Sequence, residues 1–233
     1  MKQSAKAIFL HKFSYSESSL IATFYTREFG LQNFLFQGGK KKAASLYPCA
    51  LCELIFYKRP DSELGKLTEA KTYVNLNLFV LNPLLSTVAF FIADVLRNSL
   101  KTEQSDQELY AFLEMYLEKV NEQMNLDGSM LALDFLIEFA GHLGIEPLVG
   151  STNKRYFYLN EGSFSDVDLS GELVREGRAV FLIQDTLRGL RSGQYLLEDK
   201  RIALEMMIRY YELHIPNFNV ERSLKVIREI LYT

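Results

Sequence analysis

Short segments in which apolar and polar residues alternate fill the first 80 residues of the chain. They are rich in β-branched and aromatic residues, are separated by turn-forming residues, and span 7–13, 20–25, 31–37, 50–57 and 67–74. Alternation with a period of two is typical of strands that bury one face. Five short strands so close together predict a small closed or partly open barrel, because closure removes exposed sheet edges. An open antiparallel sheet is the alternative.

Turn signals predict how these strands are connected. Residues 28–30 (EFG) are typical of a tight turn, and Gly38-Gly39 opens a longer loop before the fourth segment. Residues 14–19 separate the first two segments, and Pro60 begins a turn before the fifth. All of these connections are short enough for neighbouring strands to pair.

From residue 83 the apolar residues recur every three or four positions, which predicts helices. Asn82 is a suitable cap for a first helix that has Pro83 in its first turn. Ser105 or Asp106 can cap a second helix, and Ser129 a third. Later helices are expected over 180–190, 199–214 and 220–231.

Residues 146–170 interrupt this helical pattern. The aromatic run 155–159, followed by Gly162 and by 163–165, predicts a short hairpin or an irregular insert. The sequence therefore predicts an α+β protein, with a barrel domain at 1–80 and a helical domain at 83–233 that carries the insert.

The composition is that of an ordinary soluble protein, with 48% hydrophobic and 24% charged residues. The longest apolar run, 88–93, is too short to span a bilayer, and the N-terminal residues do not resemble a signal peptide. Two cysteines do not make a disulfide framework. We therefore expect a cytoplasmic location and no membrane partner.

Charge is divided unevenly along the chain. Residues 1–82 contain 11 Lys and Arg against 6 Asp and Glu, a net charge of +5. The remaining residues contain 15 against 23, a net charge of −8. The overall charge of −3 argues against nucleic acid as a partner, but the division indicates a basic module joined to an acidic one.

The sequence lacks the common motifs of catalysis and cofactor binding: a phosphate-binding Gly-rich loop, a dinucleotide fingerprint and a Gly-x-Ser-x-Gly elbow. Its three histidines are scattered. Cys49 and Cys52 have the spacing of a metal or redox pair, but no second pair completes a zinc site, and we interpret them as buried cysteines. We expect a protein that is not an enzyme and that binds no metal or cofactor.

Basic residues cluster around the predicted barrel strands, and three of them follow one another on the predicted flexible loop after the third segment. Cations on one surface bind DNA by neutralising phosphates and releasing counterions. The candidates for DNA contact are Arg27, Lys40, Lys41, Lys42, Lys58, Arg59, Lys66 and Lys71. A solvated loop that only promotes solubility explains the three lysines at 40–42 equally well.

Three aromatic residues lie among these cations and offer surfaces on which unpaired bases can stack: Phe34, Phe36 and Tyr57. Phe34 and Phe36 share one face of their strand, because they are two positions apart. For these two residues, a place in the barrel core is the favoured interpretation.

Several segments spread over the chain carry a recognisable pattern: 7–10 (AIFL), 15–21 (YSESSLI), 25–31 (YTREFGL), 38–42 (GGKKK), 46–48 (LYP), 64–70 (LGKLTEA) and 209–214 (RYYELH). In this order they resemble the RecO family of DNA repair proteins. The resemblance covers nearly the whole chain and is densest over residues 7–71.

The resemblance implies an N-terminal OB-fold followed by a helical domain. It implies a recombination mediator of the bacterial cytoplasm and nucleoid that binds single- and double-stranded DNA, anneals complementary strands and, with RecR, helps to load RecA onto DNA coated by single-strand-binding protein. It places Lys40–Lys42 and Arg27 on the DNA-binding face. The tail of the single-strand-binding protein would need a basic pocket on the helical domain, for which Arg188 and Arg191 are candidates.

The chain departs from the family pattern in the insert. Many members carry a four-cysteine zinc module there, whereas residues 146–168 contain no cysteine. The resemblance therefore does not extend to zinc, and the insert resembles a metal-free remnant. The alternative function is a non-catalytic protein–protein adaptor, whose barrel recognises a peptide or an acidic partner.

Overall fold

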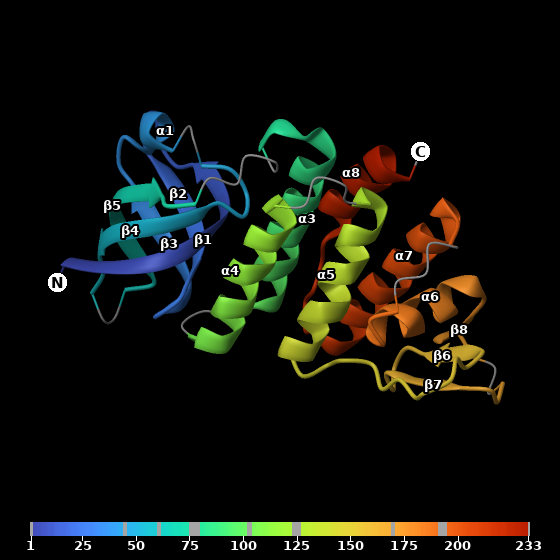
Figure 1. Cartoon of the computed structure of the whole chain (residues 1–233). Coiled ribbons are helices and arrows are strands. Elements are labelled where there is room, and N and C mark those ends of the chain that lie inside the picture. Colours follow the sequence, from blue (N-terminus) through green and yellow to red (C-terminus); the bar gives the residue numbers. More distant parts are fainter. Residues whose placement is uncertain are drawn as a thin grey trace. The chain divides into compact units, whose positions relative to one another are not determined.

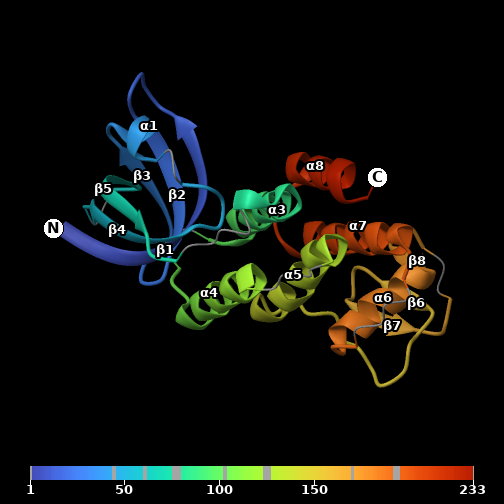
Figure 2. The same ribbon diagram turned by 45° about the horizontal axis from the view of Figure 1, so that its top comes forward.

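The structure is a computed structural model that describes residues 2–43, 46–59, 62–74, 80–101, 104–122, 127–168, 171–190 and 195–232, without the side chain of Lys42. The chain divides into two compact units, Met1–Leu126 and Asp127–Thr233. Each unit is described by itself below. Figures 1 and 2 show the elements from two directions.

Five strands of the first unit close into a barrel: β1 (Lys2–Ser14), β2 (Leu20–Thr26), β3 (Gly30–Phe36), β4 (Leu51–Tyr57) and β5 (Leu64–Thr72) (Figure 1). Their order around the barrel is β1-β2-β3-β5-β4, and β1 also pairs with β4. All pairs are antiparallel except β3 with β5. This is the OB-fold, a five-stranded Greek-key barrel. The predicted barrel is confirmed, and the open sheet is excluded.

Large aromatic rings fill the inside of the barrel. Phe34 lies at the centre, with its ring centroid 4.8 Å from that of Phe56 and 6.0 Å from that of Phe24. Gly65 leaves room for this packing, because a Cβ atom on it would lie 2.6 Å from the Phe34 ring. Rings that meet edge to face or tilted bury a large apolar area, so they stabilise this small core strongly.

Between β3 and β4, residues 39–42 form a helical turn, α1 (Gly39–Lys42), at one end of the barrel (Figure 1). The expectation of a flexible loop is wrong here. A Cβ atom on Gly39 would lie 2.8 Å from the Leu20 side chain, so this backbone packs directly on the barrel. The Lys12 ammonium then donates to the carbonyl oxygens of Ala43 at 2.5 Å and Leu46 at 2.9 Å.

Two helices of the first unit follow the barrel: α3 (Pro83–Ser99) and α4 (Gln107–Glu122). As predicted, Asn82 caps α3, and its side chain accepts from two backbone N–H groups of the first turn. Asp106, one of the two predicted caps, caps α4, because its carboxylate accepts from the backbone N–H of Leu109 at 2.9 Å.

Polar contacts join the barrel to α4. The Tyr73 hydroxyl donates to the Glu114 carboxylate, which also pairs with Lys6 at 3.2 Å. The Tyr25 hydroxyl bonds to the carbonyl oxygen of Asp106, and burial raises the pKa of this phenol to about 12. These contacts cover part of the outer surface of β1 and β2.

The second unit consists of four helices among the described residues, and a three-stranded sheet. The helices are α5 (Gly128–His142), α6 (Arg178–Leu187), α7 (Leu197–His214) and α8 (Glu221–Leu231), and the strands β6 (Tyr156–Tyr158), β7 (Ser163–Ser165) and β8 (Val174–Glu176). Asp127 caps α5, so the expectation that Ser129 would do so is wrong. The insert contains the expected hairpin and adds β8 on its other side, in the order β7-β6-β8 (Figure 2).

Among the described residues, no helix combines the length and the apolar character needed to cross a membrane. Cys49 and Cys52 are both fully buried, which agrees with the expectation of ordinary buried or half-buried cysteines. Burial raises the pKa of both thiols, that of Cys52 to about 12, so neither is a thiolate at neutral pH.

Candidate nucleic-acid interface

One row of outward-facing residues runs around the barrel through all five strands. Directly paired positions lie on the same face of a sheet, so the register defines the row. Ile21 pairs with Leu35, Leu35 with Lys66, and Lys66 with Tyr57. Phe13 and Lys2 extend this row at its two ends, opposite Ile21 and Tyr57. We call these residues the outer row: Phe13, Ile21, Leu35, Lys66, Tyr57 and Lys2.

The outer row combines exposed aromatic rings with exposed ammonium groups. Phe13 is 49% exposed and Tyr57 47%. Lys2 and Lys66 are exposed, and the two aliphatic members are half-buried. Aromatic faces for bases and cations for phosphates are the two elements of a surface that binds single-stranded nucleic acid. In OB-folds the face of strands 2 and 3 and the loops β1–β2 and β4–β5 bind oligonucleotides, and this row crosses that face.

Phe13 was not among the predicted site residues, and the reason is a β-bulge. Strict alternation places Phe13 on the same face as Phe9, which is buried in the core. The register of β1 shifts between Phe9 and His11, so Phe13 turns outward and Lys12 turns toward the barrel interior. This bulge therefore supplies an exposed ring, that of Phe13, to the surface, and a half-buried ammonium group, that of Lys12, to the carbonyl oxygens that follow α1.

At one end of the row, α1 lies against the loop between β1 and β2. The backbone N–H of Lys40 donates to the carbonyl oxygen of Ser18 at 3.4 Å. Lys40 and Lys41 are exposed, and Tyr15 in the same loop is 63% exposed. The Lys42 side chain lies outside the described part of the chain. This end of the barrel thus presents two predicted cations and a second aromatic residue that the prediction missed.

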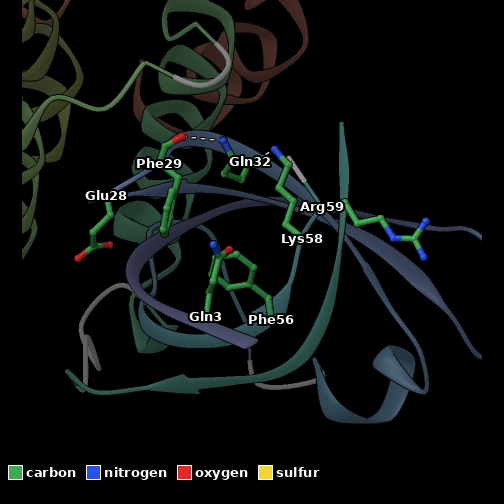
Figure 3. Close-up of a pocket in the computed structure, with 7 residues that line it drawn as sticks. All are labelled: Gln3, Glu28, Phe29, Gln32, Phe56, Lys58 and Arg59. Carbon is green, nitrogen blue, oxygen red and sulfur yellow. Dashed lines mark hydrogen bonds between the residues drawn. The ribbon is translucent and has the colours of Figure 1, made fainter. Parts of the chain in front are cut away.

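An open pocket of about 260 Å³ lies toward the other end of β3 (Figure 3). Its lining residues are Gln3, Glu28, Phe29, Gln32, Phe56, Lys58 and Arg59. The Lys58 ammonium donates to the Gln32 side-chain oxygen at 2.6 Å, and the Gln32 amide donates to the carbonyl oxygen of Phe29 at 2.6 Å. Figure 3 shows Arg59 pointing away from the rest of the group. Two predicted cations therefore belong to this pocket.

The structure does not bring Arg27 and Lys71 into the outer row. Arg27 lies in the turn between β2 and β3, where its backbone N–H donates to the backbone carbonyl oxygen of Lys6 at 2.9 Å. Lys71 is exposed on β5 but lies opposite Glu53 of β4, and Glu53 also lies opposite Lys6 of β1. The carboxylate between two ammonium groups lowers the positive potential there, so this part of the barrel is a weaker candidate for phosphate contact.

Phe34 and Phe36, two candidates for stacking on unpaired bases, cannot have this role in the structure. They are 0% and 1% exposed, because both side chains point into the barrel. The favoured interpretation, that they form the core, is confirmed. Tyr57 is the only one of the three predicted rings that is accessible to a base in the described structure.

Several exposed cations on the described part of the barrel lack carboxylate partners. Among the residues that the structure describes, Lys40, Lys41, Arg59 and Lys66 form no ion pair. A cation that is not neutralised within the protein keeps its full charge for a phosphate. The geometry therefore provides a basic and aromatic surface on one side of the OB-fold.

The candidate partner site on the second unit is different. The Arg188 guanidinium pairs with Asp185 at 2.7 Å and also donates to Asn153 and to the carbonyl oxygen of Gly150. Its side chain is only 16% exposed. Arg191 lies outside the described residues. Arg188 thus holds the start of the insert against α6, and its charge is already neutralised by Asp185.

The insert does not fit a zinc ion. The described residues contain no group of three or more His, Cys, Asp and Glu side chains arranged to hold a metal. Instead the Phe157 ring stacks on Phe164, with 4.4 Å between centroids, and lies 5.7 Å from Tyr210 of α7. The core of the insert is therefore a cluster of aromatic rings.

The fold and the outer row define a class: an OB-fold protein with a helical C-terminal half and a basic, aromatic barrel surface. Comparison with known proteins gives the family. Residues 1–75 match the family model described as "Recombination protein O N terminal", and residues 81–222 match "Recombination protein O C terminal". The chain belongs to the recombination protein O (RecO) family of DNA repair proteins.

Curated relatives agree with this family over their whole length. The chain is 30% identical to the DNA repair protein RecO of Christiangramia forsetii, over 97% of both chains. It is 29% identical to that of Phocaeicola vulgatus and 25% identical to that of Flavobacterium psychrophilum, each over 99% of both chains. The two family models also divide the chain between residues 75 and 81, whereas the first compact unit extends to Leu126, because α3 and α4 contact the barrel.

Proposed function

We propose that this protein is a non-catalytic recombination mediator that binds single- and double-stranded DNA through the outer row and α1 of its barrel. The proposal is carried by three exposed cations, Lys40, Lys41 and Lys66, which form no ion pair with any described residue. The exposed rings of Phe13, Tyr15 and Tyr57 accompany them on this surface. Cations alone would serve duplex and single strands alike, and the rings add affinity for unpaired bases.

A surface of this kind would also promote the annealing of complementary DNA strands. A protein that neutralises the phosphates of two complementary strands reduces their mutual repulsion, and weak, sequence-independent contacts let the strands search for register. Membership in the RecO family further supports cooperation with RecR in loading RecA onto DNA coated by single-strand-binding protein. The place of action would be the bacterial cytoplasm, at the nucleoid.

The experiment is charge reversal at α1. Changing Lys40, Lys41 and Lys42 together to Glu should abolish most binding to a labelled single-stranded oligonucleotide at moderate salt, and with it annealing of complementary oligonucleotides. The matched control is Arg222→Glu with Lys225→Glu on α8, two exposed cations far from the barrel in sequence. Equal affinities of the α1 variant and wild type would contradict the proposed face. No binding by wild type at low salt would favour the adaptor function.

A further inference from the structure

The pocket between the β2–β3 turn and the β4–β5 loop has a chemistry of its own. One wall is the Phe29 ring, which meets the Phe56 ring edge to face at 5.8 Å and 89°. The Gln3 side chain lies at the opposite wall, because Gln3 pairs with Phe56 and shares its inward-facing side of the barrel (Figure 3). Lys58 and Arg59 supply positive charge on one side, and Glu28 supplies a carboxylate on the other.

These groups fit a flat ligand with hydrogen-bonding edges and an anion attached to it. A primary amide offers both donors and an acceptor, as the edge of a nucleobase requires. The Glu28 carboxylate accepts from exocyclic amino groups, and it also keeps a free anion away from its side of the pocket. The volume of about 260 Å³ lies just below the range of about 300–1,000 Å³ for sites of drug-sized ligands, which suits a single ring system.

The pocket is held in shape by buried contacts. Thr26 is fully buried, and its hydroxyl donates to the carbonyl oxygen of Gly30 at 2.8 Å and accepts from the backbone N–H of Phe29 at 3.1 Å. Gly30 has a φ of 64°, and a Cβ atom on it would lie 2.3 Å from the Gln104 backbone oxygen. A turn fixed from both sides does not need to be ordered when a ligand binds, so little affinity is lost to entropy.

We propose that this pocket receives one unstacked nucleobase of single-stranded DNA, with the adjoining phosphate next to Lys58 and Arg59. The proposal rests on the proposed function and adds a site for a single base to it. Bases in a duplex are paired and stacked, so the pocket is closed to them. It therefore gives the protein a preference for single strands that the phosphate contacts of the outer row cannot provide.

The test compares single- and double-stranded DNA on the same variants. Gln3→Leu with Phe29→Leu removes the amide and the flat ring and keeps the site apolar. We expect the affinity for an oligodeoxycytidylate, whose bases carry an exocyclic amino group, to fall about tenfold, with unchanged affinity for a duplex. Gln3→Leu alone should lower single-strand affinity by a smaller factor, which covers the case in which Phe29→Leu fails to fold. The matched control is Gln107→Leu on the exposed start of α4, which should bind as wild type does.

A second arm uses a mononucleotide and a variant of the pocket that leaves the outer row unchanged. Saturation transfer by NMR from the full-length protein to deoxyadenosine monophosphate should label the base protons, and Arg59→Gln should weaken this signal, whereas Arg222→Gln should not. Labelling of an aspartate-rich hexapeptide in place of the nucleotide would overturn the proposal in favour of a peptide site.

The outcomes separate the two proposals. If wild type binds neither form of DNA, the proposed function fails, and the base pocket fails with it. If wild type binds both forms and the pocket variants keep their single-strand affinity, only the base pocket is overturned. An equal fall in affinity for single strands and for duplex overturns it too, because a base pocket cannot affect a duplex.

Discussion

The barrel and the second unit use the same basic residues in different ways. Among the described residues of the second unit, many cations pair with nearby carboxylates: Lys154–Asp166, Arg155–Glu176, Arg178–Asp199, Arg188–Asp185, Lys200–Asp127, Arg201–Glu198, Arg209–Glu212 and Arg228–Glu205. On the described part of the barrel, Lys6 pairs with Glu114, whereas Lys40, Lys41 and Lys66 have no carboxylate partner. The net charge of each unit does not show which of its cations are paired with carboxylates. We therefore expect the cations without a carboxylate partner to contribute more to DNA binding than the paired ones.

The aromatic residues of the barrel show a similar contrast within neighbouring strands. Phe34 and Phe56 stabilise the core from inside, whereas Tyr57, one position further along β4, lies outside beside Lys66. Composition cannot separate the two groups, because both belong to the same short segments. The register of the strands separates them.

Replacing a core ring should have the largest effect. Phe34→Ala removes a fully buried ring that contacts two others, and we expect it to lower the free energy of unfolding by about 3–5 kcal/mol. Urea unfolding followed by circular dichroism measures this. Tyr57→Ala should change the same free energy by less than about 0.5 kcal/mol. Similar losses for both variants would mean that Tyr57 also belongs to the core.

The next largest effect is expected for the outward-facing ring of Tyr57, whose loss should change DNA affinity but not stability. Tyr57→Ala should weaken binding of a single-stranded oligonucleotide about tenfold, because base–aromatic stacking contributes about 1–3 kcal/mol per base. Tyr57→Phe keeps the ring and should restore affinity. Fluorescence anisotropy at constant salt is the measurement, and a Tyr57→Ala variant with wild-type affinity would remove Tyr57 from the interface.

A smaller effect is expected for a paired cation of the second unit. Lys200 lies 2.5 Å from Asp127 and 3.2 Å from the Ser129 hydroxyl. Lys200→Met should lower the free energy of unfolding by no more than about 1 kcal/mol, because half of the Asp127 side chain is exposed to water. Affinity for DNA should stay the same. A clear loss of DNA affinity would show that the paired cations also serve the interface.

The smallest effect depends on pH. Burial raises the pKa of Asp127, but hydrogen bonds from Lys200 and Ser129 outweigh it and leave the pKa below the ordinary value of 3.8. A lowered pKa in the folded state stabilises above the ordinary value, and this contribution is lost as pH falls through the lowered one. Between pH 5 and about 3, Asp127→Asn should therefore lose less stability than wild type in urea titrations. Parallel curves of the free energy of unfolding against pH for the variant and wild type would mean that Asp127 does not contribute to this pH dependence.

The sequence predicted the strands from two signals. Buried and exposed residues alternate along much of β4 and β5, whereas short aromatic and β-branched runs between turns marked β1 and β2, parts of which are buried on both faces. The helix caps at Asn82 and Asp106 were predictable for a local reason, since the capping side chain and the N–H groups are a few residues apart. The four-residue helix α1 could not be predicted from the sequence, because its position depends on the contact with Lys12 and on the packing of Gly39 against Leu20. Strand β8 was missed because its partner β6 lies far from it along the chain.

The candidate site was predicted only in part, for the same reason. The positions of Lys40, Lys41 and Lys66 follow from the sequence, but their lack of ion pairs is a property of the folded chain. The bulge after Phe9 moved Phe13 out of the core, and no residue type in β1 signals that shift. The Arg188 side chain was expected to be available. Asp185 lies only three residues before it at the end of α6, but Asn153 and Gly150 belong to the start of the insert, which only the fold brings next to Arg188.

The salt dependence of DNA binding tests most directly the claim that the unpaired barrel cations make the interface. The measurement compares the slope of log K against log salt for a single-stranded oligonucleotide in wild type, in a barrel triple variant (Lys40, Lys41 and Lys66 to Gln) and in a helical triple variant (Arg155, Arg209 and Arg228 to Gln). The barrel variant should lose about two units of slope, and the helical variant should keep the wild-type slope. Equal slopes for the two triple variants would contradict the account.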